Sequence, residues 1–271
     1  MKSLPKISVI IATLGDRITE LKRLLETLEN QTYTHFEVLF VLQQEQDVWS
    51  NILEGYNLNT RVVMMSGRGL SKARNLGLAH ATGDIVTFSD DDCWYGHETF
   101  AHVVASMQTG KDVISLNMYD PNRKKFGRDQ HIQTPKFLTK RELLSRSSIE
   151  IFVKRSCLDK NEAGPAILFD EAFGLGASHI SGEENIFLVD LFQKGYRTYF
   201  HPEYLVYHAV QARITRLTRA QILSKGPLFR RMYNTPTAFV LVILFYVKKK
   251  QRNLFWEVLK ATWTYRSRGE Q

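Results

Sequence analysis

The sequence predicts an α/β fold in which helices flank a mostly parallel sheet and a basic helical appendage follows. Over about the first 90 residues, short apolar runs rich in β-branched residues alternate with amphipathic stretches, which indicates βαβ units. Some runs, such as VLFVL, are almost continuously apolar, as expected of strands covered on both faces. The chain of 271 residues is long enough for one large domain and an appendage.

The N-terminal part shows the alternation most clearly. Strands are expected at residues 6–12, 36–42, 61–65 and 84–89, with helices at 18–30 and 70–81. The first helix places its apolar residues on one face, which is expected to pack on the sheet: Ile18, Leu21, Leu24, Leu25 and Leu28. Ligands of such sheets bind beyond the carboxyl ends of the strands, so a site is expected at TLGDR, QQEQD and SDDD.

The second part of the chain is less regular. A strand is expected at 112–120, followed by a polar surface excursion at 121–140. The segment 148–158 is interpreted as a strand, 169–184 as a glycine-bearing loop, 185–195 as a helix that Gly195 ends, and 198–209 as one or two short strands.

Cysteine usage and the N-terminus favour a reducing, cytoplasmic setting. Neither Cys93 nor Cys157 belongs to a CxxC pair, so neither a zinc site built on cysteines nor a disulfide framework is expected. The apolar stretch after Pro5 ends at Thr13, which is too short for a signal peptide.

Positive charge is concentrated in the C-terminal tail. Residues 207–271 carry 13 Lys/Arg against 2 Asp/Glu, and they flank the apolar run TAFVLVILFYV. That run is shorter than the roughly 20 residues of a spanning helix. With Arg230–Arg231 before it, 248–250 after it and Trp256 and Trp263 downstream, it predicts a helix on an anionic membrane surface and no binding to nucleic acid. The alternative is an appendage packed on the main domain.

Three adjacent carboxylates, Asp90, Asp91 and Asp92, follow a predicted strand. They repel one another unless a cation or several donors compensate. Alternate residues of an extended segment point the same way, so Asp90 and Asp92 are expected to converge on one ion while Asp91 turns aside. Oxygen ligands favour Mg²⁺ or Mn²⁺, and Mg²⁺ is often shared with substrate phosphates. The alternative is an acidic loop capping a helix that begins near Gly96.

Two further features contain candidate catalytic or ligand-binding groups. Glu183 and Glu184 open a helix, where they either stabilise its positive end or supply a base that takes a proton from a hydroxyl. His208 ends a predicted strand; such a histidine is commonly structural, but it also suits Mn²⁺ beside two carboxylates.

Four segments taken in order resemble glycosyltransferase family 2, the inverting enzymes with the GT-A fold: ISVIIATLGDR, LENQTYTHFEVLFV, SKARNLGLAHATGDIVTFSDDD and FGLGASHISGEENIFLVDLFQKG. The resemblance covers about residues 6–208. It implies a Rossmann-like GT-A catalytic domain at 1–210, with a nucleotide-sugar half at about 1–119 and an acceptor half at about 120–210. The tail at 211–271 lies outside it.

The resemblance also implies roles for the acidic residues. Asp90 and Asp92 correspond to the DxD pair that contacts the ribose and the metal-bound diphosphate, with Asp91 beside them in the donor site. His208 corresponds to a metal-binding histidine that follows the catalytic helix. Glu183 and Glu184 correspond to the family's catalytic pair, with Glu184 in place of the usual aspartate base.

The remaining expected site residues surround the nucleotide and the acceptor. Thr13, Arg17 and Arg74 correspond to positions that line the nucleotide pocket, although surface or helix-pair roles are the alternative for both arginines. Gln43 stands where the family commonly has DDGS, so recognition of the nucleobase is expected to differ. The glycine loop on the acceptor side is FGLG: Phe173, Gly174, Leu175 and Gly176.

These features together predict a metal-dependent inverting glycosyltransferase, with Mg²⁺ or Mn²⁺ as cofactor. It would move a sugar from a nucleotide-diphosphate donor to a saccharide or lipid-linked saccharide, in cell-surface polysaccharide or glycolipid synthesis. The tail would hold it peripherally on the cytoplasmic face of the cell membrane. The alternatives are a sugar-nucleotide nucleotidyltransferase, although TLGDR has one glycine where a glycine-rich loop is needed, and a noncatalytic membrane-bound nucleotide or saccharide binder.

Overall fold

The computed structural model describes residues 4–44, 52–122, 125–126, 132–162, 164–209, 217–249 and 254–266. Within these ranges one sheet contains ten strands: β1 Ile7–Thr13, β2 Phe36–Leu42, β3 Thr60–Met64, β4 Ile85–Asp90, β5 Cys93–Tyr95, β6 Val113–Asp120, β7 Lys125–Phe126, β8 Lys136–Phe137, β9 Ile151–Lys154 and β10 Thr198–His208. The helices of the main body are α1 Ile18–Glu29, α3 Leu70–His80, α4 Thr99–Gln108, α5 Lys140–Leu143 and α6 Glu183–Gln193.

The sheet is mostly parallel, in the order β3-β2-β1-β4-β9-β6-β10-β5. β1 to β4 pair in parallel, as do β6 and β10, and the short β9 lies antiparallel between β4 and β6. At the far edge β5 pairs antiparallel with β10. This topology brings the carboxyl ends of β1, β4 and β10 to the same edge of the sheet.

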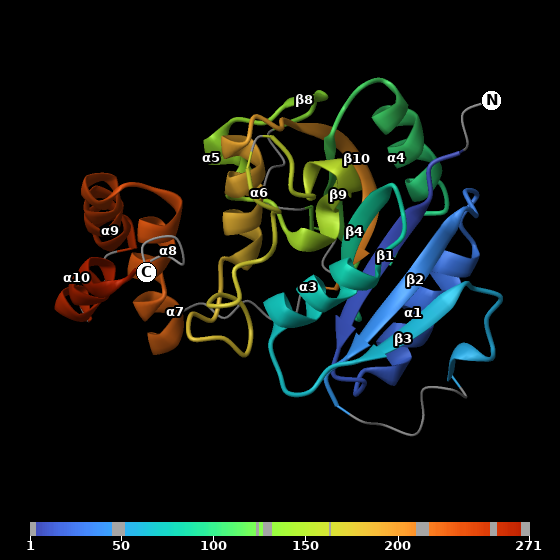
Figure 1. Cartoon of the computed structure of the whole chain (residues 1–271), viewed down its shortest axis with the longest axis horizontal. Helices are drawn as coiled ribbons and strands as arrows, with labels where there is room; N and C mark the ends of the chain where they lie inside the picture. The colour runs from blue at the N-terminus through green and yellow to red at the C-terminus, as the bar shows by residue number, and fades with distance from the viewer. Residues whose placement is uncertain are drawn as a thin grey trace.

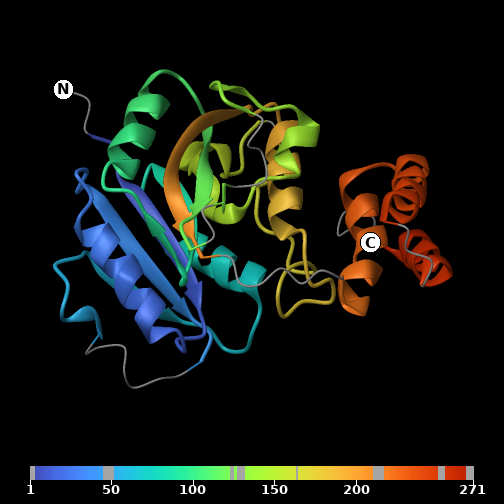
Figure 2. The ribbon, with the colours of Figure 1, turned by 180° about the vertical axis from the view of Figure 1, so that it is seen from behind.

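Helices cover both faces of the sheet, as the uninterrupted apolar strands indicate. Every residue of β1 and β2 is buried. On one face the apolar stripe of α1 packs with α4, and on the other α3 and α6 share a second core with Phe88 of β4. Figure 1 shows the face with α3 and α6, and Figure 2 shows α1 and α4 over the opposite face.

The predicted strand at 148–158 is wrong over most of its length. Only Ile151–Lys154 forms strand β9, because 3₁₀ turns at Ser148–Glu150 and Arg155–Cys157 flank it. The first turn is stabilised by the Glu150 carboxylate, which accepts from the Ser147 backbone N–H at 2.6 Å. A local side-chain bond therefore replaces the strand pairing that the apolar pattern favoured.

The structure also decides the predicted strands at 198–209 and describes part of the predicted surface excursion at 121–140. The segment 198–209 forms one strand, β10, which passes through Pro202 with irregular pairing between Phe200 and Tyr204. Proline is tolerated at such an irregularity because no ladder hydrogen bond is lost there. In the expected surface excursion, residues 123–124 and 127–131 lie outside the described part, and β7 and β8 join the sheet.

The described residues of the tail form four helices beside α6: α7 Arg219–Leu223, α8 Lys225–Met232, α9 Thr235–Lys249 and α10 Phe255–Thr264 (Figure 1). α8 packs on α6, because Leu228 and Met232 share a buried cluster with Ile186 and Val189. Arg231 lies between the two elements and forms ion pairs with aspartates of the main body. The segment 236–247 is part of α9, and no described helix is both long and apolar enough to span a bilayer.

Arg231 therefore has a different role from the one expected of a membrane-facing basic pair. Its guanidinium binds Asp170 at 2.8 Å and Asp190 at 2.7 Å. These two charge partners raise the pKa of Arg231, although burial opposes the shift. The tail is thus both packed on the main body, which was the alternative interpretation, and anchored to it by a charged group.

Candidate active site

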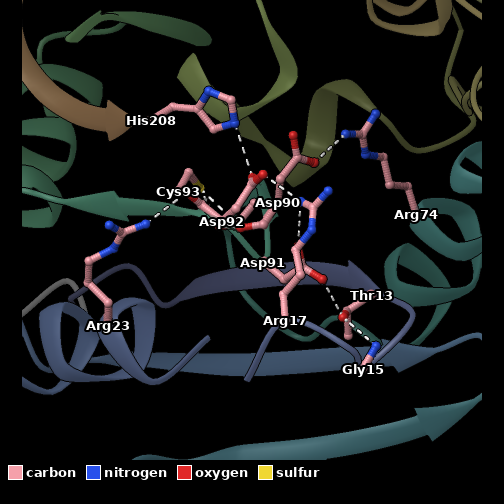
Figure 3. Close-up of polar contacts among 11 residues, drawn as sticks. Thr13, Gly15, Arg17, Arg23, Arg74, Asp90, Asp91, Asp92, Cys93 and His208 are labelled. Carbon is pink, nitrogen blue, oxygen red and sulfur yellow. Dashed lines mark hydrogen bonds and ion pairs between the residues drawn. The ribbon is translucent and has the colours of Figure 1, made fainter. Parts of the chain in front are cut away.

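The acidic cluster lies in a turn at the carboxyl end of β4. The strand ends at Asp90, and Asp91 and Asp92 form a turn before β5 begins. Thr13 Oγ1 at the end of β1 donates a hydrogen bond to Asp91 at 2.5 Å. Arg17 pairs with Asp91 at 3.2 Å and also with Asp92 (Figure 3). Because the extended backbone stops at Asp90, strand alternation does not decide the direction of the two following side chains.

Asp92 and His208 form the first candidate pair of metal ligands. β5 and β10 place His208 opposite Cys93, which puts His208 Nε2 at 3.1 Å from Asp92 Oδ1 (Figure 3). The hydrogen bond to Asp92 raises the pKa of His208 against the effect of burial. For Asp92, burial alone would raise the pKa, but His208 and Arg17 together lower it.

Asp91 differs from its neighbours in its electrostatics. Burial raises the pKa of its carboxyl group, although Thr13 and Arg17 oppose the shift. Its residue is only 8% exposed, whereas the Asp90 side chain is 35% exposed. Asp91 is therefore held against β1 as a fixed acceptor.

Arg74 connects the acidic cluster to the candidate catalytic pair. Its side chain is only 2% exposed and lies on α3. Its guanidinium forms ion pairs with Asp90 at 3.0 Å and Glu183 at 3.5 Å, and donates to Ser148 Oγ at 2.7 Å. Arg74 thus reaches the site through its partners, and it is not among the residues that line the cavity described below.

Glu183 and Glu184 begin α6, and their surroundings differ. Glu183 is buried and Glu184 is partly exposed. Burial and the neighbouring charge of Glu184 raise the pKa of Glu183 well above its ordinary value, although Arg74 opposes this. The two side chains are hydrogen-bonded to each other. Glu183 is therefore biased towards its neutral form, in which its carboxyl group can donate to Glu184.

The glycine loop is held against the N-terminus of α3. Ser71 Oγ donates to the Phe173 carbonyl at 2.6 Å, and the Leu70 N–H donates to the Leu175 carbonyl at 2.9 Å. Gly174 adopts a φ of 104° and a Cβ there would lie 3.2 Å from Glu183 Cδ. Glycine is therefore needed both for its backbone conformation and for the close approach of the catalytic pair.

A cavity of about 460 Å³ lies at this edge of the sheet, and the expected site residues Phe173, Gly174, Glu183 and Glu184 are not among those that line it. Its lining includes many of the expected residues: Thr13, Arg17, Gln43, Asp90, Asp91, Asp92, Leu175, Gly176 and His208. Gln43 Oε1 accepts from the Gly69 N–H at 2.8 Å, so its carbonyl is used to hold the turn before α3.

Six lining residues were not singled out from the motifs: Ala12, Leu14, Asp16, Arg68, Gly69 and Leu70. Arg68 and Gly69 lie just after β3. The rule that ligands bind beyond the carboxyl ends of the strands, applied to this strand as it was to β4, would have identified them. Asp16 follows β1 in TLGDR, a strand end that was identified without this residue being singled out.

The donor set at this edge of the sheet suits a divalent cation. Asp92 Oδ1 and His208 Nε2 are adjacent and partly exposed, and Asp90 lies in the same cavity. Carboxylate oxygen with one imidazole nitrogen is a ligand set that Mn²⁺ accepts, and carboxylates alone suit Mg²⁺. The residue types present therefore fit such an ion, but the ligand atoms of Asp90, Asp92 and His208 do not all converge on one point in the described structure, contrary to the expected convergence of Asp90 and Asp92.

Comparison with solved structures defines the fold class. The chain superimposes on S. aureus TarS 1–349 in complex with UDP-GlcNAc with a TM-score of 0.70 and 21% identity, covering 94% of this chain and 79% of TarS. The mannosyltransferase PcManGT from Pyrobaculum calidifontis, in complex with GDP-Man and Mn²⁺, gives 0.60 and 16% identity, covering 96% and 74%. At these identities the likeness concerns the fold, which is the GT-A fold of glycosyltransferases.

The family follows from the sequence. The profile of Glycosyl transferase family 2 matches residues 8–161, more than half of the chain. The chain therefore belongs to glycosyl transferase family 2, and both the predicted fold class and the resemblance are confirmed.

Curated relatives share shorter stretches. EpsH of Bacillus subtilis (strain 168), named as a glycosyltransferase, is 30% identical over 116 residues, and the glycosyltransferase GlyA of Streptococcus pneumoniae serotype 4 is 32% identical over 92 residues. The matched stretches are 42% and 33% of this chain, but they span only 33% of EpsH and 13% of GlyA.

Proposed function

We propose that the protein transfers a sugar from a nucleotide-diphosphate donor to a hydroxyl group of a saccharide or lipid-linked saccharide, with inversion at the anomeric carbon. The observation that carries this proposal is Arg74. It joins Asp90, at the donor end of the cavity, to Glu183, beside the candidate base. One buried guanidinium thus sets the relative position of the diphosphate-binding and proton-accepting groups. Cell-surface polysaccharide or glycolipid synthesis is the process in which such a transfer is needed.

The donor end of the cavity combines groups that bind a nucleoside diphosphate. Arg17 and Arg68 line it and offer positive charge to phosphate oxygens. Asp92 and His208, with Asp90, would hold a divalent cation. When bound, that cation would offset the charge of the departing diphosphate. Gln43, placed at the end of β2, is assigned to the nucleoside side through its amide group.

We assign Glu184 as the base. Direct attack by an acceptor hydroxyl needs one carboxylate to take the proton and no covalent nucleophile, and it inverts the anomeric centre. Glu184 is the partly exposed member of its pair, and the buried Glu183 contacts it on one side and Arg74 on the other. The exposed Leu175 of the glycine loop lies where an acceptor would enter.

The proposal is tested by separating donor binding from transfer. Thermal stabilisation by UDP-GlcNAc and by GDP-Man, each with Mg²⁺ or Mn²⁺, measures donor binding. Release of nucleoside diphosphate, with water replacing the acceptor, measures the chemical step. Asp92→Ala is expected to lose cation-dependent stabilisation, whereas Glu184→Gln keeps it and loses at least about a hundredfold in turnover.

A matched control and clear contrary outcomes complete this test. Glu26→Gln, at an exposed site on α1, makes the same chemical change away from the cavity and should leave both measurements unchanged. Full turnover by Glu184→Gln would move the base to another residue. Donor binding without any turnover by the wild-type protein would favour the noncatalytic binder.

We also propose that the tail binds an anionic membrane surface, which would place the protein peripherally on the cytoplasmic face of the cell membrane. α9 and α10 run antiparallel, because Phe239 contacts Trp263 and Tyr246 contacts Phe255. Together they expose an apolar surface, here termed the tail patch: Val240, Ile243, Leu244, Val247, Trp256 and Trp263. The exposed Lys248 and Lys260 lie on the same two helices.

The spacing of the tail-patch residues along α9 supports the proposal that this face of the helix contacts the membrane. On α9 its members recur at intervals of three and four residues, so they form one face, while Val242 and Tyr246 face the other helices and are buried. An apolar face with tryptophans and lysines nearby is typical of a helix lying in the membrane interface.

Flotation with liposomes tests this part of the proposal. Vesicles with anionic lipid should float the wild-type protein but not an Ile243→Ser/Trp256→Ser variant, and neutral vesicles should bind less of both. Val62→Ser, which removes an exposed apolar side chain from the edge strand β3, is the matched control. Equal flotation of all three proteins would refute membrane binding by the tail patch.

A further inference from the structure

A second group of potential metal ligands lies away from the cavity, between α4 and the middle of β10. His102 Nε2 is 3.9 Å from Glu203 Oε2, and His201 Nδ1 is 3.5 Å from the same oxygen. One ligand atom from each residue lies within 4.8 Å of the other two. The two imidazole rings meet edge to face at 4.6 Å. Two nitrogens and one carboxylate oxygen therefore converge on one point.

The hydrogen bonds of this cluster leave two lone pairs directed at that point. Ser106, one turn after His102 on α4, lies 2.6 Å from His201 Nε2. When that nitrogen donates to the serine hydroxyl, His201 Nδ1 carries the lone pair that faces Glu203. His102 Nε2 is buried and has no hydrogen-bond partner within the described part of the chain. Buried polar atoms are seldom left unpaired without a reason.

Charged and titratable groups of the neighbouring elements surround the cluster. Burial and the neighbouring His102 and Lys111 lower the pKa of His201, although Glu203 opposes this. Lys111 is held by other groups, since its Nζ bonds Thr109 at 2.5 Å and lies 4.4 Å from the centre of the Tyr199 ring. Glu203 is exposed, which gives an ion access from solvent.

We propose that His102, His201 and Glu203 form a second metal site, which binds Zn²⁺ with water as the remaining ligand. Imidazole nitrogens favour Zn²⁺ over Mg²⁺, and three protein ligands with one water are a common zinc set. The site is separate from the cavity, because His201 precedes His208 by seven residues on β10, or roughly 20 Å of strand. An ion here would join α4 to the irregular part of β10 and stabilise the folded state.

Metal titration of the full, untagged chain tests the proposal. After chelation, Zn²⁺ binding is measured by calorimetry, and Co²⁺ is used as a probe because four-coordinate Co²⁺ absorbs visible light far more strongly than six-coordinate Co²⁺. Wild-type protein should give the strong absorption and a raised melting temperature with Zn²⁺. His201→Gln and Glu203→Gln should lose both, and Ser106→Ala should weaken binding about 10–100-fold by freeing the His201 ring.

Asp92→Asn separates this site from the cavity. It should keep the strong Co²⁺ absorption, because the oxygen-rich cluster at β4 is a different site. The proposal is overturned if His201→Gln, shown by circular dichroism to be folded, retains the absorption, or if Asp92→Asn abolishes it. Of the two ligand variants, Glu203→Gln is expected to disturb folding least, because Glu203 is exposed.

Discussion

Replacing Arg74 with methionine should destabilise the fold and uncouple the two halves of the site. Methionine replaces the unbranched stem of the arginine side chain and removes the guanidinium with its charge. The Arg74 side chain is almost fully buried, and the substitution removes its two ion pairs and its hydrogen bond to Ser148. Breaking a buried pair by removing one partner costs about 3–5 kcal/mol. Glu183 already favours its neutral form, because burial and Glu184 raise its pKa, so the lower end of that range, about 3 kcal/mol, is expected.

Urea unfolding followed by tryptophan fluorescence measures this loss. The midpoint should fall while the slope stays constant, since the surface exposed on unfolding does not change. Glu183→Gln removes the carboxylate that Arg74→Met leaves unpaired. The double variant should therefore be more stable than the sum of the single effects predicts, by about 1–2 kcal/mol.

Arg74→Lys is the control that keeps the positive charge but removes the planar guanidinium group. A lysine keeps the positive charge but cannot reach Asp90, Glu183 and Ser148 with a planar fork, so it should recover only part of the stability. An unchanged midpoint in Arg74→Met, or strict additivity in the double variant, would refute the role of Arg74 as the link between the two acidic groups.

Three further predictions concern parts outside the cavity. The Glu37 pKa is lowered to about 2, because hydrogen bonds from a lysine and two hydroxyls outweigh burial. Its stabilisation, at most about 3 kcal/mol, should be complete above about pH 4.5 and disappear as the pH falls towards 2, so unfolding curves of Glu37→Gln and wild type should converge in acid. Gly182→Ala should lower the free energy of unfolding in urea by about 1–3 kcal/mol more than Gly110→Ala does. Both glycines have a positive φ, but only at Gly182 would an added Cβ meet a side chain, that of Leu228 at 2.6 Å. Arg231→Met should lower stability by about 3 kcal/mol and speed proteolytic release of the tail, whereas Arg219→Met, which breaks an exposed pair, should cost less than about 1 kcal/mol.

The sequence was sufficient for features that depend on local pattern. The strand at 36–42 and the helix at 70–81 were predicted within one residue, because continuous apolar character and helical periodicity each act over a single element. Asp92 and His208, 116 residues apart, were expected at one ion because a histidine beside two carboxylates suits Mn²⁺ and because the family resemblance pairs them. Their contact at 3.1 Å depends on the pairing of β5 with β10, which no local pattern encodes.

Other features could not be inferred because they depend on tertiary partners. In sequence, Arg74 is a basic residue on an amphipathic helix, and only the packed structure buries it between Asp90 and Glu183. Arg231 was expected to face a membrane together with its neighbour, yet the docking of α8 on α6 directs it to Asp170 and Asp190. In both cases burial of an arginine is decided by carboxylates remote in the sequence.

The docking of the tail also bears on how membrane binding must be tested. Ser224 Oγ accepts from the Ile180 N–H at 3.2 Å, Leu228 packs at Gly182, and Tyr265 contacts the ring of Phe173. The tail therefore supports the loop that leads into the proposed catalytic pair. Deleting it would remove the proposed membrane surface and loosen that loop together, so lost activity would not identify its cause. Substitutions in the tail patch leave these contacts intact, and for that reason they alone separate attachment to the membrane from support of the site.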